Sequence, residues 1–138
     1  MADIAITAAN VAPGTGAVIN RGTAGATITA GQTLYADAAN NGVLKKANAV
    51  TSAATAVCVG ISVNGASTGQ PVNYVSSGNY TVGGTVAAGA VYIVSPNNDG
   101  GIAPVADIGS GTITTVLLIG TSTTTAQIYL VSPAVAHA

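Results

Sequence analysis

The residues whose side chains could carry out catalysis are few and lie far apart in the sequence. His137 is the single histidine, Cys58 is the single cysteine, glutamate is absent, and the carboxylates are those of Asp3, Asp37, Asp99 and Asp107. A serine-type triad needs a rigidly held base, whereas His137 is the second-last residue of an alanine-rich tail. Metal sites need several closely spaced ligands, which these residues do not provide. The sequence therefore predicts no catalytic residues and no metal site, and we expect that the protein is not an enzyme.

Binding motifs for cofactors are also missing. The chain has no GxxxxGK[ST] element, and its glycine pairs do not open a helix, so phosphate binding has no support. Residues 97–101 offer oxygen ligands of the kind that Ca²⁺ prefers, but a hairpin turn explains them better, because a calcium loop needs more carboxylates. Cys58 lies in an apolar run, which predicts a buried and unreactive thiol. We expect no cofactor.

Charge is the most unusual property of the chain. Charged residues make up 5% of the sequence, and the only cations besides the histidine are Arg21, Lys45 and Lys46. With a net charge of −1 and no basic cluster, nucleic-acid binding is not expected. A protein with so few charges has little protection against association, so we expect much of its surface to be covered in its working state. A neutral, merely soluble surface is the alternative.

Nothing in the sequence resembles a membrane span or a secretion signal. The mean hydropathy is positive, at +0.55, yet no stretch reaches the roughly 18 consecutive apolar residues of a spanning helix. The first residues lack the basic region and apolar core of a secretory signal. The expectation is a protein that is made in the cytoplasm and is not exported by that route.

The elements that would position any site are predicted to be β-strands. Runs rich in β-branched residues read as strands at 26–30, 33–35, 57–63, 72–75, 91–94, 112–119 and 127–131. Between them are turn signals with Gly, Asn or Asp at 14–16, 40–42, 64–65, 77–79, 83–84, 97–101 and 109–111. Residues 48–56 are rich in alanine, and we expect a loop or a single helical turn there. This pattern predicts an all-β fold, a small barrel or sandwich of many short antiparallel strands.

The same pattern of residues occurs twice. Ala30-Gly31 and the run to Tyr35 return as Ala88-Gly89 and the run to Tyr92, and each is followed by an asparagine-rich turn. The run 57–62 is echoed by 116–122, and 70–75 by 127–131, with an offset near 58 to 60 residues. We therefore expect residues 23–138 to form one β-barrel domain with a repeated hairpin unit, about 26–76 and 84–132. Residues 1–22 would be an N-terminal arm or the first strand of the barrel.

The repeated Ala-Gly block, the asparagine-rich turn, the Val-x-Val-Gly-Ile strand and the Ala-Ser-Thr-Gly-Gln-Pro-Val hairpin at 66–72 resemble the small capsid decoration, or cement, proteins of tailed bacteriophages. This resemblance covers roughly residues 25–131. It implies a structural virion protein on the capsid exterior, one that binds the assembled head and stabilises contacts between subunits of the major capsid protein. It also implies contact with neighbouring copies, and we expect a homo-oligomer, with a trimer as the working hypothesis. A tail-fibre or spike head, or a glycan-binding β-module built on the tyrosines, is the alternative.

The residues expected to contact the capsid or a neighbouring subunit lie near the N-terminus. Ile4 and Ile6 alternate as in a strand, and Val18 and Ile19 follow a flexible Pro-Gly segment. Arg21 is a further candidate, because a lone arginine can pair with a carboxylate of the capsid.

Overall fold

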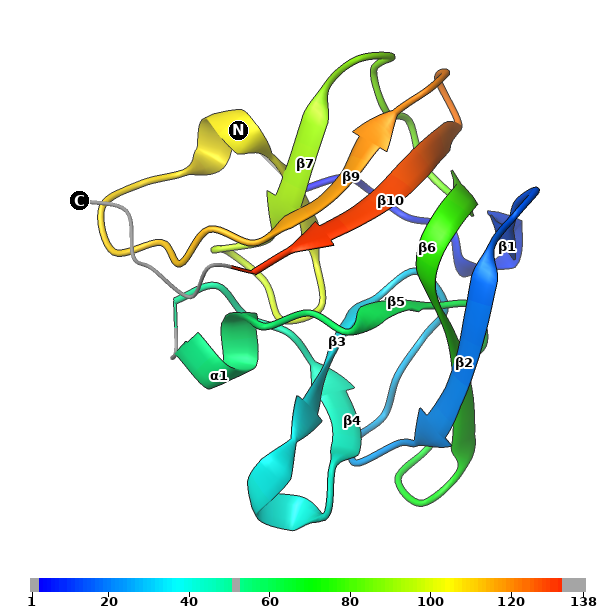
Figure 1. Ribbon diagram of the computed structural model, residues 1–138, viewed down its shortest axis with the longest axis vertical. Coiled ribbons are helices and arrows are strands. Elements are labelled where there is room, and N and C mark those ends of the chain that lie inside the picture. Colours follow the sequence, from blue (N-terminus) through cyan, green and yellow to red (C-terminus); the bar gives the residue numbers. More distant parts are fainter. Residues whose placement is uncertain (1–2, 51–52, 133–138) are drawn as a thin grey trace.

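The computed structural model describes residues 3–50 and 53–132, and this part of the chain is nearly all β (Figure 1). Its strands are β1 Val11–Pro13, β2 Val18–Thr23, β3 Thr33–Asp37, β4 Val43–Lys46, β5 Gly60–Ser62, β6 Pro71–Val82, β7 Val91–Val94, β8 Ile102–Pro104, β9 Val116–Gly120 and β10 Thr125–Val131. One helical turn, α1 Ala53–Ala56, and three 3-10 turns, η1 Ala8–Asn10, η2 Ala38–Asn40 and η3 Val105–Asp107, complete the described elements. The predicted all-β class and the single turn near residue 55 are confirmed.

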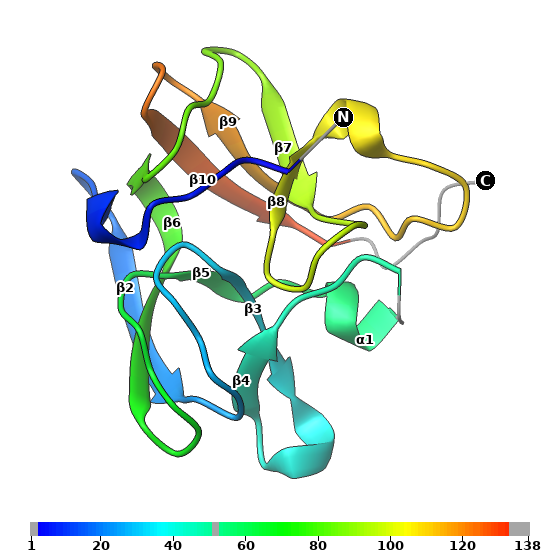
Figure 2. The same ribbon diagram turned by 180° about the vertical axis from the view of Figure 1, so that it is seen from behind.

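The strands form one curled antiparallel sheet, a half-barrel that is organised around β6. The order along the sheet is β4-β3-β5-β6-β10-β9-β7-β8, and β1 and β2 both pair with β6 as well. One side of β6 therefore carries β5 and β10, and the other side carries β2 followed by β1 (Figures 1 and 2). A twelve-residue strand can serve this many neighbours because each of them pairs with only part of its length.

The pairing order occurs twice in the sheet. The first half has the order β4-β3-β5-β6-β2, and the second half has the order β8-β7-β9-β10-β6. The register repeats as well, because the pair Leu34–Lys46 in β3 and β4 returns 58 positions later as Tyr92–Pro104 in β7 and β8. The β3–β5 register likewise returns between β7 and β9. The duplicated hairpin pattern of the sequence thus has a counterpart in the fold, although β6 belongs to both halves.

The structure corrects the predicted correspondence of the last block of the repeat. Ser62 pairs with Tyr74 in the first half, and the equivalent pair in the second half is Gly120–Ala126. The position of Tyr74 is therefore taken by Ala126, so 70–75 does not correspond to 127–131. The turn between β9 and β10 is shorter than the turn between β5 and β6, and a matching glutamine in each block hid this difference.

Residues 77–79 do not form the predicted turn, because β6 continues through them with a bend. Gly78 has a φ of +93°, and a register shift lies at Ser76 opposite Val18 and Ile19. A bulge with a glycine at positive φ bends a strand without ending it. The Ser-Gly-Asn sequence, which is typical of turns, marks here the place where β6 passes from one half of the sheet to the other.

Several predicted strands are shorter or absent. Residues 26–30 make only an isolated bridge, in which Ile28 pairs with Ala66, and the runs 57–63 and 112–119 are strand only over β5 and β9. Within residues 1–22, which were predicted as an arm or as the first strand of the barrel, β1 and most of β2 are strands of the sheet that pair with β6. β4 and β8 were not predicted, because short strands containing Pro or Lys lack a strong β-branched signal, and their pairing with β3 and β7 makes them extended.

The core lies in two clusters, one for each half of the sheet. The smaller cluster fills the first half and contains Ala24, Ile28, Leu34, Leu44, Ala66 and Val72. The larger cluster fills the second half and continues between the halves, with Tyr80 and Tyr92 as its buried rings. The hydroxyl of Tyr80 donates to the carbonyl of Ser62 at 3.0 Å, which joins the bent part of β6 to β5.

Candidate functional site

The thiol of Cys58 is buried, as predicted, and has no feature of a nucleophile. Burial raises its pKa to about 12, so the thiolate is not formed at neutral pH. The Sγ–H group donates to the carbonyl of Gly60 at 3.2 Å. His137 lies outside the described residues, and within the described part of the chain there is accordingly no imidazole that could act as a base.

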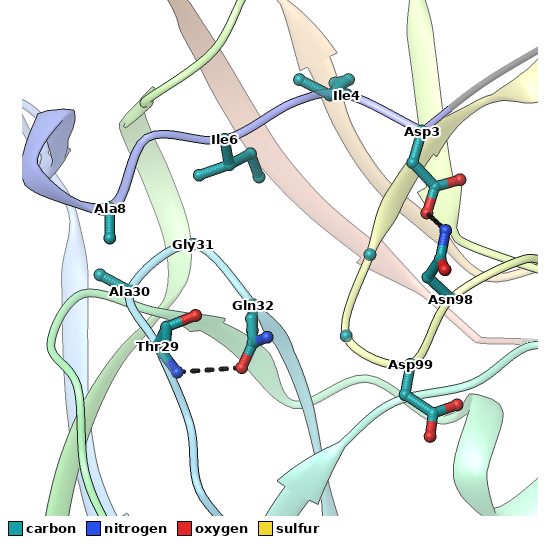
Figure 3. A pocket seen from close by; sticks show the side chains of 12 residues that line it. Asp3, Ile4, Ile6, Ala8, Thr29, Ala30, Gly31, Gln32, Asn98 and Asp99 are labelled. Atoms are coloured by element: carbon teal, nitrogen blue, oxygen red, sulfur yellow. Dashed lines mark hydrogen bonds between the residues drawn. The ribbon is translucent and has the colours of Figure 1, made fainter.

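Two of the four aspartates lie around one hollow of about 280 Å³, between the N-terminal segment and the loops before β3 and β8 (Figure 3). The carboxylate of Asp3 accepts hydrogen bonds from Ser95 Oγ at 2.7 Å, Asn98 Nδ2 at 2.9 Å and Asn97 Nδ2 at 3.3 Å. Asp99 accepts from an asparagine, Asn48 Nδ2, at 2.6 Å. Both carboxylates are therefore used to hold the β7–β8 turn and its neighbours.

This hollow has no set of ligands for a metal ion. Among the described residues, no group of three or more His, Cys, Asp or Glu side chains is placed to bind one. Residues 97–101 form the turn between β7 and β8, which confirms the hairpin interpretation of this segment. Figure 3 shows the carboxylate of Asp3 turned toward Asn98, while that of Asp99 points away from it.

The tyrosines do not form a platform of exposed rings. Tyr80 and Tyr92 are buried, Tyr35 and Tyr74 are partly buried, and Tyr129 on β10 is 54% exposed. A carbohydrate platform needs flat aromatic faces that are open to solvent, and these side chains leave a single ring in that state.

Ile4 and Ile6 lie on the segment that precedes β1, and both are partly buried against the core of the second half. The backbone N–H of Ile4 donates to the carbonyl of Ile102 in β8 at 2.9 Å, and that of Thr7 donates to Gly83 at 2.8 Å. Ile6 packs against the loop at Gly31, where a Cβ atom would come within 2.6 Å of its side chain. The structure thus places both isoleucines against the chain's own sheet, and their part in binding a neighbour stays a prediction.

Val18, Ile19 and Arg21 lie on β2, at the other side of the molecule from α1 (Figure 1). Val18 is 49% exposed and Ile19 is 52% exposed. Arg21 is exposed and makes no ion pair with any of the described residues. The structure therefore brings three of the five predicted contact residues together on one strand and separates them from Ile4 and Ile6.

The backbone of β2 has an open side. The N–H of Ala24 donates a hydrogen bond to the carbonyl of Gln70, and the carbonyl of Ala24 accepts one from the N–H of Gly69. These two hydrogen bonds show which residues of β2 bond to β6. Because bonded and non-bonded pairs alternate in an antiparallel ladder, Gly22 and Asn20 point toward β6. The N–H and C=O groups of Ile19, Arg21 and Thr23 point away from it. β4 lies beside Thr23, through the parallel bridge between Ala24 and Leu44, and no strand among the described residues pairs with Ile19 or Arg21 on this side.

Other edges of the sheet are covered by the chain itself. Ile4 lies against β8, and Gly25 donates its N–H to the carbonyl of Leu44 in β4 at 2.7 Å. An open strand edge beside exposed apolar side chains is a template for pairing with another chain. The sequence did not reveal this edge, because the prediction of residues 1–22 as an arm or as the first strand of the barrel does not say which side of a strand stays unpaired.

The chain has no match to any protein-family model, to any curated protein or to any solved structure. Within the described residues, no helix has the length and apolar character needed to cross a membrane.

Proposed function

We propose that this protein is a structural virion protein of a tailed bacteriophage, which binds the outer surface of the assembled head and stabilises contacts between major capsid protein subunits. The observation that carries the proposal is the neutral surface of an all-β fold, in which exposed valine, isoleucine and tyrosine side chains occupy β2 and β10. This surface, together with the resemblance of residues 25–131 to decoration proteins, supports a role in binding other proteins through a complementary surface. Such a role needs no catalytic groups and no cofactor.

Binding of this kind stabilises a shell by mass action. A protein that binds the assembled lattice but not its separated subunits shifts the equilibrium toward assembly. Contacts that are weak singly add up when they are repeated over a lattice or within an oligomer. The low charge removes the repulsion that would otherwise oppose crowding many copies onto one surface.

The protein is proposed to bind its own neighbours as well as the shell, as a trimer. Native mass spectrometry of the free protein and of protein released from heads tests this, because a trimer gives three times the chain mass of 13.1 kDa. A monomer in both samples would contradict the trimer and leave attachment to the shell unaffected.

The function is tested by mixing the purified protein with tailed-phage heads that lack their decoration protein. The heads are pelleted, the bound copies are counted, and the heads are heated until they break. We expect saturable binding in a fixed ratio to the capsid subunits and a higher breakage temperature. Ile19→Asn should weaken binding, whereas the matched variant Val105→Asn, at an exposed valine on η3, should not.

If a folded protein does not bind such heads, the proposal is wrong. Glycan arrays and receptor-binding assays would then address the alternative, a spike-type or sugar-binding module, for which the exposed ring of Tyr129 is the first side chain to replace.

A further inference from the structure

The two halves of the sheet close in different ways. In the first half, β2 continues to β4, where Gly25 donates its N–H to the carbonyl of Leu44 at 2.7 Å. In the second half, Ile102 of β8 has the place of Leu44 in the register of the repeat. The carbonyl of Ile102 accepts from the N–H of Ile4, at 2.9 Å. The N-terminal segment thus takes the place beside β8 that Gly25 has beside β4.

This segment, residues 3–13, extends from β8 to the end of β6 (Figure 2). After Ile4 has bonded to β8, Thr7 donates its N–H to the carbonyl of Gly83 at 2.8 Å. β1 then pairs with β6, and Ala12 lies opposite Thr81. The second half is therefore closed by a segment that comes from outside the repeated unit.

Glycines make room for the N-terminal segment on the sheet. At Gly31, a Cβ atom would lie 2.6 Å from the side chain of Ile6. The carboxylate of Asp3 accepts hydrogen bonds from three side chains of the β7–β8 turn. The groove thus fits the sequence of this segment, so the same segment of another copy fits it equally well. The glycines at which a Cβ atom would collide with residues 3–11 are Gly31, Gly83, Gly84 and Gly101.

The segment has a hollow on each of its two faces. Ile4 and Ile6 line the hollow of about 280 Å³ that Figure 3 shows. Ala5 and Thr7, which alternate with them, line a second hollow of about 520 Å³. Parts of a protein with few covering contacts open at a lower free energy than its core does. The segment can therefore leave its groove more easily than a strand from the middle of the sheet.

A short turn, residues 14–17, links the segment to β2. The N–H of Ala17 donates to the carbonyl of Gly14 at 3.2 Å, and Gly16 has a φ of +74° with open space beside it. The exposed side chains of Val18 and Ile19 follow the turn directly. If the turn opened and the segment passed to a neighbouring copy, the two chains would cross at Val18 and Ile19. The crossing would cover both apolar side chains.

We propose that copies of this protein exchange their N-terminal segments, so that residues 3–13 of one copy lie in the groove of the next. Exchange of an identical element has a low cost because the contacts are the same as within one chain, and a high local concentration favours it. In a trimer, each copy gives its segment to the next and the ring closes. The inference rests on the proposed self-association and goes beyond it by naming the element that links the copies.

The test is a disulfide between β1 and β6 in the full-length variant Ala12→Cys/Thr81→Cys. The two positions lie directly opposite each other, at a spacing that a disulfide can bridge. After oxidation at high protein concentration, we expect a non-reducing gel to show most chains linked into dimers and trimers. If the disulfide forms and every chain still migrates singly, the segment lies in its own chain and the proposal is overturned.

The matched control is Arg21→Cys/Asn73→Cys, which joins β2 to the same strand β6. Because β2 follows the turn, this disulfide lies within one chain whether or not the segments exchange. We expect the control to migrate as single chains. Linking of the control to the same extent as the test variant would assign the links to chance collisions and overturn the proposal.

A second measurement uses the protein without substitutions, so that it does not depend on the reactivity of the introduced cysteines. Isotope-labelled and unlabelled copies are unfolded together, refolded at high concentration and studied by isotope-filtered NMR. We expect nuclear Overhauser effects between Ile6 of one copy and Gly31 of another. If these effects occur only within one chain, the proposal is wrong.

Native mass spectrometry and head binding separate this inference from the proposed function. A trimer in which the test disulfide lies within each chain keeps the proposed trimer and overturns the exchange. Linked chains that do not bind heads support the exchange, while the proposed function fails.

Discussion

Buried hydroxyl groups in this core differ in whether they have a hydrogen-bond partner. The Oγ1 atom of Thr33 is buried without one among the described residues. Ser62, which is also fully buried, donates to the carbonyl of Thr29 at 2.7 Å and accepts from the N–H of Gln32 at 3.1 Å. A buried polar atom without a partner costs stability, whereas a paired one has its desolvation offset.

We predict that Thr33→Val leaves the free energy of unfolding unchanged or raises it by up to about 1 kcal/mol. The repeat supports this, because the equivalent residue of β7 is Val91. Ser62→Ala should lower the free energy of unfolding by about 1–3 kcal/mol, because Gln32 loses its acceptor. Denaturant unfolding of both variants measures this, and equal losses in the two would contradict the distinction.

The ion pair between Lys45 and Asp37 gives a dependence on pH. Lys45 Nζ lies 2.8 Å from Asp37 Oδ2, and its hydrogen bond, with that of Asn40, holds the pKa of Asp37 below the usual 3.8. The same bond raises the pKa of Lys45 above 10.5. The pair is partly exposed, with 33% of the Lys45 side chain and 15% of the Asp37 side chain open to solvent, so salt screens part of its contribution.

A carboxyl group whose pKa is lowered by folding stabilises the protein at pH values above its pKa in the unfolded chain, and this stabilisation is lost as pH falls through its pKa in the folded protein. A lysine whose pKa is raised by folding stabilises the protein at pH values below its pKa in the unfolded chain, and this stabilisation is lost as pH rises through its pKa in the folded protein. We therefore expect Asp37→Asn to unfold at a lower temperature than the parent at pH 7, with the difference shrinking as pH falls through the lowered pKa of Asp37 and as pH rises through the raised pKa of Lys45. An NMR titration of Asp37 gives its pKa directly, and a value at or above 3.8 would contradict the expected shift.

At the scale of elements, the bend in β6 depends on Gly78. Its φ of +93° favours glycine, and a Cβ atom there would collide with the backbone of Gly16 and Ala17. We predict that Gly78→Ala lowers the free energy of unfolding by about 2–4 kcal/mol, from backbone strain together with this collision.

Gly69 is the matched control, since its φ of +88° is similar but a Cβ atom there would meet open space. Gly69→Ala should cost about 1 kcal/mol, the conformational part alone. Comparable losses in the two variants, measured by thermal or denaturant unfolding, would show that the bend does not need the close approach of the strands.

Sequence patterns identify those elements that carry their own local signal. The run 91–94 is strand β7 to the residue, and the Asn-Gly turn after β3 adopts positive φ at Asn41 and Gly42. The bend at Gly78 was not predicted, because it depends on strands far along the chain that pair with β6. Val18 and Ile19 could be named as candidate contact residues, but the open backbone beside Ile19 could not be predicted, since an edge exists only once a sheet is assembled.

At the scale of the whole molecule, sharing β6 joins the two halves into one unit. The paired strands of each half include β6, and its residues Val72 and Tyr80 belong to different core clusters. If one half opened alone, it would expose the side of β6 that the other half requires. We therefore expect a single cooperative unfolding transition.

Leu34 and Leu118 test this expectation, because each is fully buried and they belong to the clusters of different halves. Leu34→Ala and Leu118→Ala should each lower the free energy of unfolding by about 2–5 kcal/mol. In both variants, calorimetry should show one transition moved to lower temperature. Two separate transitions in either variant would contradict the coupling.

The pairing of β1 with the far end of β6 also sets an order in time during synthesis. As the chain leaves the ribosome from its N-terminus, Val11 has no partner until Val82 has emerged, and Ile4 has none until Ile102 has. The hairpin of β3 and β4, by contrast, can close at once, because its strands are neighbours in sequence. The segment that finally covers two edges of the sheet is thus made before the strands that it pairs with, and it is among the last to be placed.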